Sequence, residues 1–137
     1  MIMNNNLMKG DYFNYNGTIV RVFSYGVNVV VEDVDGKNKY VVKENDLQPI
    51  PISSEFMKNN GFVKELDYTA SIEEYDLKQL DFPFTIAHDI IHDEWYGGTY
   101  MVGRDYDWIT KQFPCQYIHQ LQHAFNLCNI TKDFIIN

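Results

Sequence analysis

The sequence predicts an α+β protein, with an N-terminal SH3-like β-barrel over residues 1–52 and an α+β lobe over residues 53–137 packed against it. Two turn signals, Asn16-Gly17 and Asp35-Gly36, separate short segments rich in Val and aromatic residues, which is the pattern of antiparallel hairpins. A helix-start signal follows Ile52, and a segment near the C-terminus repeats its apolar residues with the period of an amphipathic helix.

The first half contains four expected strands joined by these turns. Val27–Glu32 is apolar enough for burial on both faces. Glu44–Leu47 resembles a single helical turn, and two prolines keep the segment up to Ile52 extended. This outline matches a small SH3-like barrel, whose expected strands are residues 11–15, 18–25, 27–32 and 38–43. The stretch Lys9–Phe13 followed by Gly17–Val22 also resembles the opening of KOW-type barrels.

The second half combines a short helix, extended segments and a longer helix. Ser53 is expected to cap the short helix, which ends near Gly61. Gly97-Gly98 is expected to form a turn, and Pro114 is expected to open a helix over Cys115–Cys128. The expected strands are residues 62–68, 71–80, 82–95, 99–102 and 134–136. The apolar face of the long helix is expected to hold Tyr117, Ile118, Leu121, Ala124, Phe125 and Cys128, and its polar face Gln116, His119, His123 and Asn126.

Charge and cysteine content limit the classes of partner. The chain carries 11 Lys and Arg against 19 Asp and Glu, for a formal net charge of −8, and no run of basic residues. Nucleic-acid phosphates and anionic membranes are therefore disfavoured as partners. Cys115 and Cys128 are expected to be reduced thiols, which is typical of a cytoplasmic protein. We expect neither a signal peptide nor a membrane span, since no window approaches about 18 apolar residues.

The four histidines form two pairs with the same spacing, His88/His92 and His119/His123. On a helix, residues four apart share a face, so His119 and His123 could bind one metal ion. A third ligand could come from Asp89, Asp93 or Glu94. The alternative is that these histidines face solvent or form hydrogen bonds. Gln120 follows His119 where a zinc hydrolase motif has Glu, and His88 and His92 lie in an expected strand, roughly 13 Å apart.

The remaining candidates concern binding rather than catalysis. No nucleophile elbow or phosphate-binding glycine motif is present, and neither catalytic residues nor a cofactor site is predicted. The acidic residues between 89 and 107 are expected to form a solvated loop, since their spacing does not fit a calcium loop. An aromatic stretch could anchor a protein interface or fill the core; its members are Trp95, Tyr96, Tyr100, Arg104, Tyr106 and Trp108.

Three stretches carry a resemblance: Gly10–Tyr12 with Tyr15–Gly17, Leu47–Ile52 leading to Asn60–Phe62, and Tyr117–Gln122. Together they resemble a group of small uncharacterised proteins from gut bacteria and their phages. The resemblance implies an α+β fold, no known activity, and a role for His119 in docking the helix onto the sheet through a hydrogen bond. The sequence therefore predicts a non-catalytic protein-interaction module of phage or mobile-element origin. The alternatives are metal binding at His119 and His123, and nucleic-acid binding through the barrel.

Overall fold

The computed structural model describes residues 7–65, 71–77, 84–102 and 107–136, with the backbone alone for residues 99–102 and 107–111. The chain divides into two units. Unit 1 contains residues 1–51 and 117–132, and unit 2 contains residues 52–116 and 133–137. The described residues form two antiparallel sheets and two α-helices, which confirms the α+β class. The first division between the units falls between residues 51 and 52, and the C-terminal helix is grouped with the N-terminal sheet.

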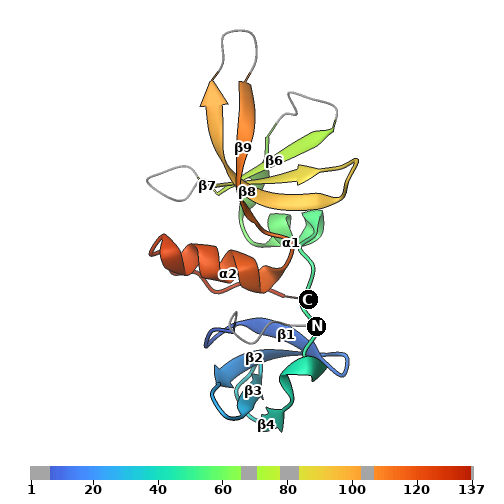
Figure 1. Ribbon diagram of the computed structural model, residues 1–137, viewed down its shortest axis with the longest axis vertical. Coiled ribbons are helices and arrows are strands. Elements are labelled where there is room, and N and C mark those ends of the chain that lie inside the picture. The colour runs from blue at the N-terminus through green and yellow to red at the C-terminus, as the bar shows by residue number, and fades with distance from the viewer. Residues whose placement is uncertain (1–6, 66–70, 78–83, 103–106, 137) are drawn as a thin grey trace. The chain divides into compact units, whose positions relative to one another are not determined.

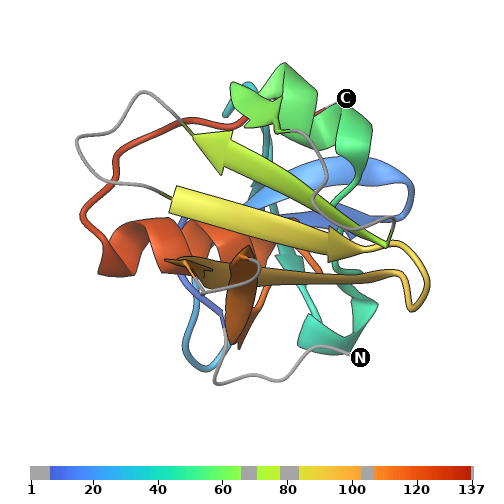
Figure 2. The ribbon, with the colours of Figure 1, turned by 90° about the horizontal axis from the view of Figure 1, so that it is seen from above.

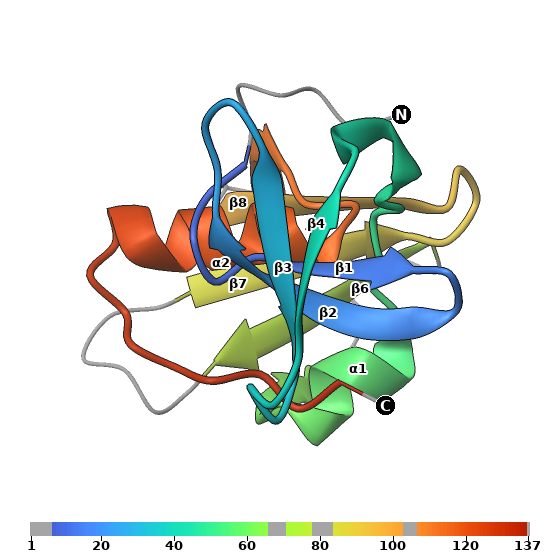
Figure 3. The same cartoon turned by 90° about the horizontal axis from the view of Figure 1, so that it is seen from below.

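Unit 1 contains a four-stranded antiparallel meander in the order β1-β2-β3-β4, as Figure 3 shows. Its strands are β1 (Tyr12–Tyr15), β2 (Thr18–Ser24), β3 (Val29–Asp33) and β4 (Lys39–Val42). The predicted turn at Asn16-Gly17 is confirmed, because both residues have positive φ (51° and 83°), as a type I′ turn requires. The expected helical turn is the 3-10 helix η2 (Glu44–Asp46).

The core of unit 1 lies on one face of this meander; it consists of Leu7, Phe13, Val20, Val22, Val29, Val31, Val42 and Leu47. Burial of β3 on both faces was a wrong expectation, because Val27 precedes the strand in an exposed turn and Val30 is only half-buried. Asn14 of the edge strand β1 forms a single antiparallel bridge with Gln48. Within the described residues the strands do not close into a barrel, so the predicted SH3-like barrel is not confirmed.

Helix α2 (Ile118–Leu127) packs beside β1 in unit 1 (Figure 1). Gln120 closes its first turn by accepting a hydrogen bond from the Tyr117 backbone N–H at 3.0 Å. The predicted helix began three residues too early, because Pro114 ends a strand instead of opening the helix. The predicted apolar residues are buried, namely Ile118, Leu121, Ala124 and Phe125, whereas Cys128 is exposed and His119 is buried, contrary to prediction.

Unit 2 contains a short helix and a five-stranded antiparallel sheet in the order β5-β6-β7-β8-β9 (Figures 1 and 2). Ser53 caps α1 (Ser54–Asn59) as predicted, with its Oγ accepting a hydrogen bond from the Phe56 N–H at 3.1 Å. The strands are β5 (Phe62–Lys64), β6 (Ile72–Leu77), β7 (Phe84–Asp89), β8 (Glu94–Val102) and β9 (Asp107–Pro114). The sequence did not predict β9.

Gly97 and Gly98 lie inside β8, so the turn predicted there was wrong. Gly97 pairs directly with Phe113 of β9, and the register shifts between the two glycines. A Cβ atom on Gly97 would lie 1.9 Å from Cζ of Phe113. The glycine is therefore needed to make room for a ring on the neighbouring strand, rather than to reverse the chain.

Residues 134–136 do not form the predicted strand. The side chain of Asn60 makes the hydrogen bonds to Ile135 that a neighbouring strand would make. Its Oδ1 accepts from the Ile135 N–H at 2.7 Å, and its Nδ2 donates to the Ile135 carbonyl at 2.9 Å. Phe134 packs against Phe56 of α1, with ring centroids 5.5 Å apart.

Candidate functional site

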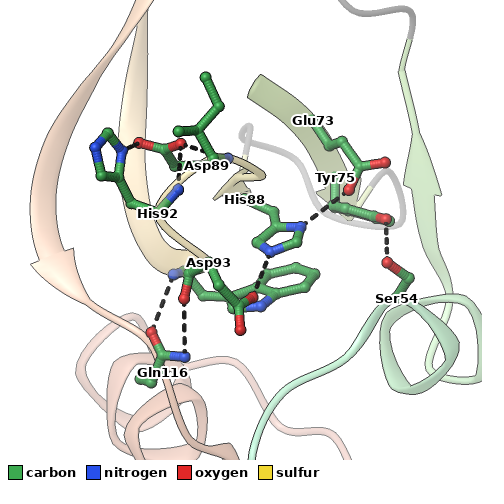
Figure 4. A network of polar contacts seen from close by, with 10 residues as sticks. Ser54, Glu73, Tyr75, His88, Asp89, His92, Asp93 and Gln116 are labelled. Atoms are coloured by element: carbon green, nitrogen blue, oxygen red, sulfur yellow. Dashed lines mark hydrogen bonds and ion pairs between the residues drawn. The ribbon is translucent and has the colours of Figure 1, made fainter. Parts of the chain in front are cut away.

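The candidate site lies at the β7–β8 hairpin of unit 2, where His88 is held between two carboxylates (Figure 4). The strand register places Glu73, His88 and Trp95 in one row across β6, β7 and β8. His88 Nδ1 lies 3.0 Å from Glu73 Oε1, and its Nε2 lies 2.9 Å from Asp93 Oδ1. Each carboxylate can accept a hydrogen bond from the ring nitrogen that faces it when that nitrogen carries a hydrogen.

Aromatic stacking fixes the plane of the His88 ring. The imidazole stacks on the indole of Trp95, with centroids 4.0 Å apart and an interplanar angle of 10°. Tyr75 packs against the same indole and donates its hydroxyl hydrogen to Ser54 Oγ at 2.9 Å. Gln116 holds the start of β8, because its Oε1 accepts from the Trp95 N–H. The base of the hairpin is therefore held by ring packing and by hydrogen bonds to residues outside it.

Asp89 holds the turn between β7 and β8 in place. We call this turn, residues 89–93, the hairpin tip. The Oδ1 of Asp89 accepts from the backbone N–H groups of Ile91 and His92, and its Oδ2 lies 2.8 Å from His92 Nδ1. The Ile90 N–H donates to the carbonyl of Ser71 at 2.8 Å. Asp93 has φ of 49°, in the left-handed region that Asp tolerates. Sequence reasoning missed this tip. Asp at the start of a turn is a recognised turn signal, because its carboxylate can accept hydrogen bonds from backbone N–H groups a few residues later.

The hairpin tip exposes two adjacent isoleucines. Ile91 is 74 % exposed and Ile90 is 46 % exposed, on a turn whose backbone is held by the bonds just described. Large apolar side chains presented together on a rigid loop are typical of contact surfaces rather than of a core.

Electrostatics around the tip is dominated by carboxylates. Burial raises the pKa of Glu73, but hydrogen bonds from Lys64 and His88 lower this pKa by more, so Glu73 stays ionised to below its ordinary range. A hydrogen bond from His92 lowers the pKa of Asp89. Among the tip residues, Asp89 therefore keeps its negative charge to a lower pH than an ordinary aspartate does.

The pair His119 and His123 lies in unit 1, on the side of α2 that packs on β1. Asp11, which is 1 % exposed, accepts hydrogen bonds at Oδ2 from the Met8 N–H at 2.8 Å and from His123 Nε2 at 2.7 Å. His119 is 7 % exposed and its Nδ1 is buried without a hydrogen-bond partner. Its ring packs on Phe13 with centroids 4.8 Å apart. His119 thus docks the helix by ring packing, and not by the hydrogen bond that the resemblance implied.

Gln122 supplies the hydrogen bonds that dock α2 onto the sheet. Its Oε1 accepts from the Tyr12 N–H at 2.9 Å, and its Nε2 donates to the Gly10 carbonyl at 2.8 Å. The amide thus bonds the chain on both sides of Asp11. Neither Gln122 nor Asp11 was predicted as a site residue.

The predicted aromatic site is described only in part, by the side chains of Trp95 and Tyr96 and the backbone of Tyr100 and Trp108. Trp95 is 3 % exposed and Tyr96 is also buried, because β8 is an inner strand of the sheet, so these two side chains belong to the core alternative. Tyr100 pairs with Ile109, and Trp108 with Met101, in the β8–β9 ladder. Arg104 and Tyr106 lie outside the described residues.

The predicted metal pair is brought together, with ring centroids of His119 and His123 5.7 Å apart. By contrast, His88 and His92 bond to different carboxylates and do not form a pair. Asp93 and Asp89, proposed as third ligands, are the acceptors of these bonds. In the part of the chain that the structure describes, no group of three or more His, Cys, Asp or Glu residues is arranged to hold a metal ion.

Both cysteines are free, as predicted. Burial raises the pKa of the Cys115 thiol to about 12, so this thiol stays protonated and is a poor nucleophile at neutral pH.

The buried His119 predicts an acid-sensitive unit 1. Burial lowers the pKa of His119, the charge of Asp11 opposes this effect, and His123 lowers the pKa further. The unfolded chain therefore binds the proton more readily, and the free energy of unfolding falls as the pH drops below about 6.5. We expect His119→Gln to make this fall between pH 7.5 and 5.5 shallower, measured by urea unfolding followed through NMR signals of unit 1.

The matched control is His92→Gln, because His92 lies on the exposed tip of unit 2. It should leave the pH dependence of unit 1 as steep as in the unmodified protein. An unchanged slope in His119→Gln would contradict the prediction.

Comparisons of the chain with protein-family profiles, with curated proteins and with solved structures return no match. Among the described residues, no helix has both the length and the apolar character needed to cross a membrane.

Proposed function

We propose that this protein is a non-catalytic protein-interaction module whose contact element is the hairpin tip. The observation that carries the proposal is the exposure of Ile90 and Ile91 on a turn held by three hydrogen bonds to Asp89. A rigid apolar projection loses little conformational entropy when it enters a pocket, so most of its burial contributes to affinity.

The charge of unit 2 indicates the chemistry of the partner. Unit 2 contains five Lys and Arg against thirteen Asp and Glu, so it accounts for the whole net charge of −8. At the tip, Asp89 and Asp93 flank the two isoleucines. The complementary partner surface is an apolar pocket with a basic rim, and opposite charge would accelerate the encounter.

Removal of the apolar side chains should abolish partner capture. We expect the tagged protein to capture a nuclease-resistant protein partner from a lysate of its native host, and the double variant Ile90→Ser, Ile91→Ser to lose it. Both side chains are exposed, so the variant should keep its stability within about 0.5 kcal/mol. Mass spectrometry of the captured material, with the melting temperature of each variant, gives the result.

Val63→Ser is the matched control, since Val63 is also an exposed apolar residue of unit 2. It should retain the partner. Equal capture by the tip variant and the control would contradict the role of the tip, and an empty capture with the unmodified protein would contradict the interaction module itself.

Metal binding is the second candidate function. It is favoured by the buried Nδ1 of His119, which has no hydrogen-bond partner and lies beside the ring of His123. The imidazole of His123 is in turn bonded to Asp11, as a carboxylate orients a histidine ligand in metal sites. Metal analysis of protein purified without a histidine tag tests it. Absence of bound transition metal, together with no thermal shift on adding zinc, would exclude it.

The fold of unit 1 and its origin are parts of the same proposal. An SH3-like barrel is supported by the four-stranded meander, by η2, and by the return of the chain at Gln48 to Asn14 of β1. Phage or mobile-element ancestry is supported by the sequence resemblance. Nucleic-acid binding through unit 1 is the weaker alternative, tested by a gel-shift assay at low salt, where phosphate attraction is strongest.

A further inference from the structure

A cationic and aromatic patch lies on the side of the unit 1 sheet opposite its core. The ammonium of Lys39 lies 4.8 Å from the ring centroid of Phe23, and that of Lys9 lies 5.6 Å from it. Phe23 is 38 % exposed. Two cations near one exposed ring form cation–π contacts that keep both charges at the surface.

The strand register defines which residues share this face. Arg21, Glu32 and Lys39 are paired across β2, β3 and β4, while Val22 and Val31 alternate with them into the core. Val30 pairs with Val41, which is 69 % exposed. The face therefore combines three cations with apolar Phe23 and Val41.

The patch has an excess of positive charge. Glu32 binds Arg21 at 2.9 Å and approaches Lys39 at 3.9 Å, so one carboxylate serves two cations. Lys9 makes no ion pair among the described residues. Unit 1 as a whole is neutral, with six Lys and Arg against six Asp and Glu. An anionic ligand would thus meet local positive charge here, in contrast to unit 2.

Strand β4, which carries Lys39 and Val41 of the patch, is also an edge of the sheet; Figure 3 shows its ribbon next to β3. Within the described residues it pairs only with β3. An edge strand presents backbone N–H and C=O groups that an extended peptide can bond, whereas nucleic acid has no matching backbone. The edge therefore favours a peptide over a nucleic acid as the anionic ligand.

We propose that unit 1 binds an extended acidic peptide segment of a partner, which adds as a strand to β4. Backbone bonds to β4 supply affinity, while carboxylates directed at Lys39 and Lys9 and apolar residues packed on Phe23 and Val41 supply specificity. This site is independent of the hairpin tip. With both sites occupied, the protein would link an acidic segment to a basic surface.

The test uses the full chain and a synthetic Glu-Val-Glu-Val-Glu-Val peptide, with a Lys-Val peptide of equal length as the probe control. We expect NMR shifts on β4 and Phe23, protection of β4 amides from exchange, and affinity that falls with salt. Lys39→Glu should weaken binding by about tenfold. Lys37→Glu makes the same charge change in the exposed β3–β4 loop and should have a smaller effect.

Lys9→Gln provides a second variant, because Lys9 has no ion pair whose loss would affect folding in the described structure. It should also weaken the binding of the acidic peptide. The proposal is overturned by no binding at about 1 mM peptide, by equal weakening in Lys37→Glu, or by shifts confined to the hairpin tip. Tighter binding of oligothymidylate would overturn it in favour of nucleic acid, and loss of self-association in Lys39→Glu in favour of a second copy.

Discussion

Gly97→Ala is expected to destabilise unit 2 by about 3 kcal/mol, the upper end of what overpacking a core costs. The added Cβ would lie 1.9 Å from Cζ and 2.3 Å from Cε1 of Phe113. Both distances are far shorter than any contact between atoms that are not bonded to each other. The backbone of Phe113 is held by its pairing with Gly97 in the β8–β9 ladder, so the ring has to rotate out of its place over Gly97 to make room for the Cβ. Urea unfolding followed by tryptophan fluorescence measures the loss, since both tryptophans lie in unit 2.

The clash can be separated from other effects of the substitution by a double-mutant cycle. Phe113→Leu alone should cost about 1 kcal/mol, because it removes part of a packed ring. The loss of stability in the Gly97→Ala, Phe113→Leu protein should be smaller than the sum of the losses in the two single variants, since the smaller side chain leaves room for the Cβ. Strict additivity would mean that the ring is not the obstacle.

Asp11→Ala is expected to destabilise unit 1 by about 3 kcal/mol. The carboxylate is almost fully buried, and its loss leaves the Met8 N–H and the His123 imidazole without their acceptor. Asp11→Asn should cost less, because its amide oxygen can take the place of Oδ2, which accepts both bonds. Hydrogen exchange at amides of β2 and β3, measured by NMR, reports the stability of unit 1 separately from unit 2.

Asp46→Ala is the matched control, since Asp46 is an exposed acidic residue of the same unit. It should change the free energy of unfolding, calculated from hydrogen exchange in β2 and β3, by less than about 0.5 kcal/mol. If Asp11→Ala exchanged at the rate of the unmodified protein, the contacts of α2 with β1 would have to rest on Gln122 and the apolar packing alone.

Signals confined to a few neighbouring residues were predicted well. The positive φ values of Asn16 and Gly17, the cap formed by Ser53 and the apolar face around Leu121 follow from local sterics and periodicity. Gly97 was misread because glycine has two roles: it permits a turn, and it permits close approach of another chain segment. The sequence around it cannot distinguish them, since Phe113 lies on a different strand.

The candidate sites depended on pairings between distant residues. Glu73 and His88, or Asp11 and His123, meet only when the strand register and the docking of α2 are set. Register is poorly specified by local pattern, because a slip of one residue exchanges the two faces of a strand. The Asp89 turn was an exception that local chemistry could have revealed.

Neighbouring residues and composition were enough to predict the α+β class, the hairpin at residues 16–17, the capped helix after residue 53, the apolar face of the last helix and the acidic balance. Three features could be seen only in the folded chain: α2 joins the N-terminal sheet, Trp95 is buried beneath His88, and Ile90 and Ile91 are exposed. These outcomes depend on which strands pair and in which register, and contacts between distant residues set both.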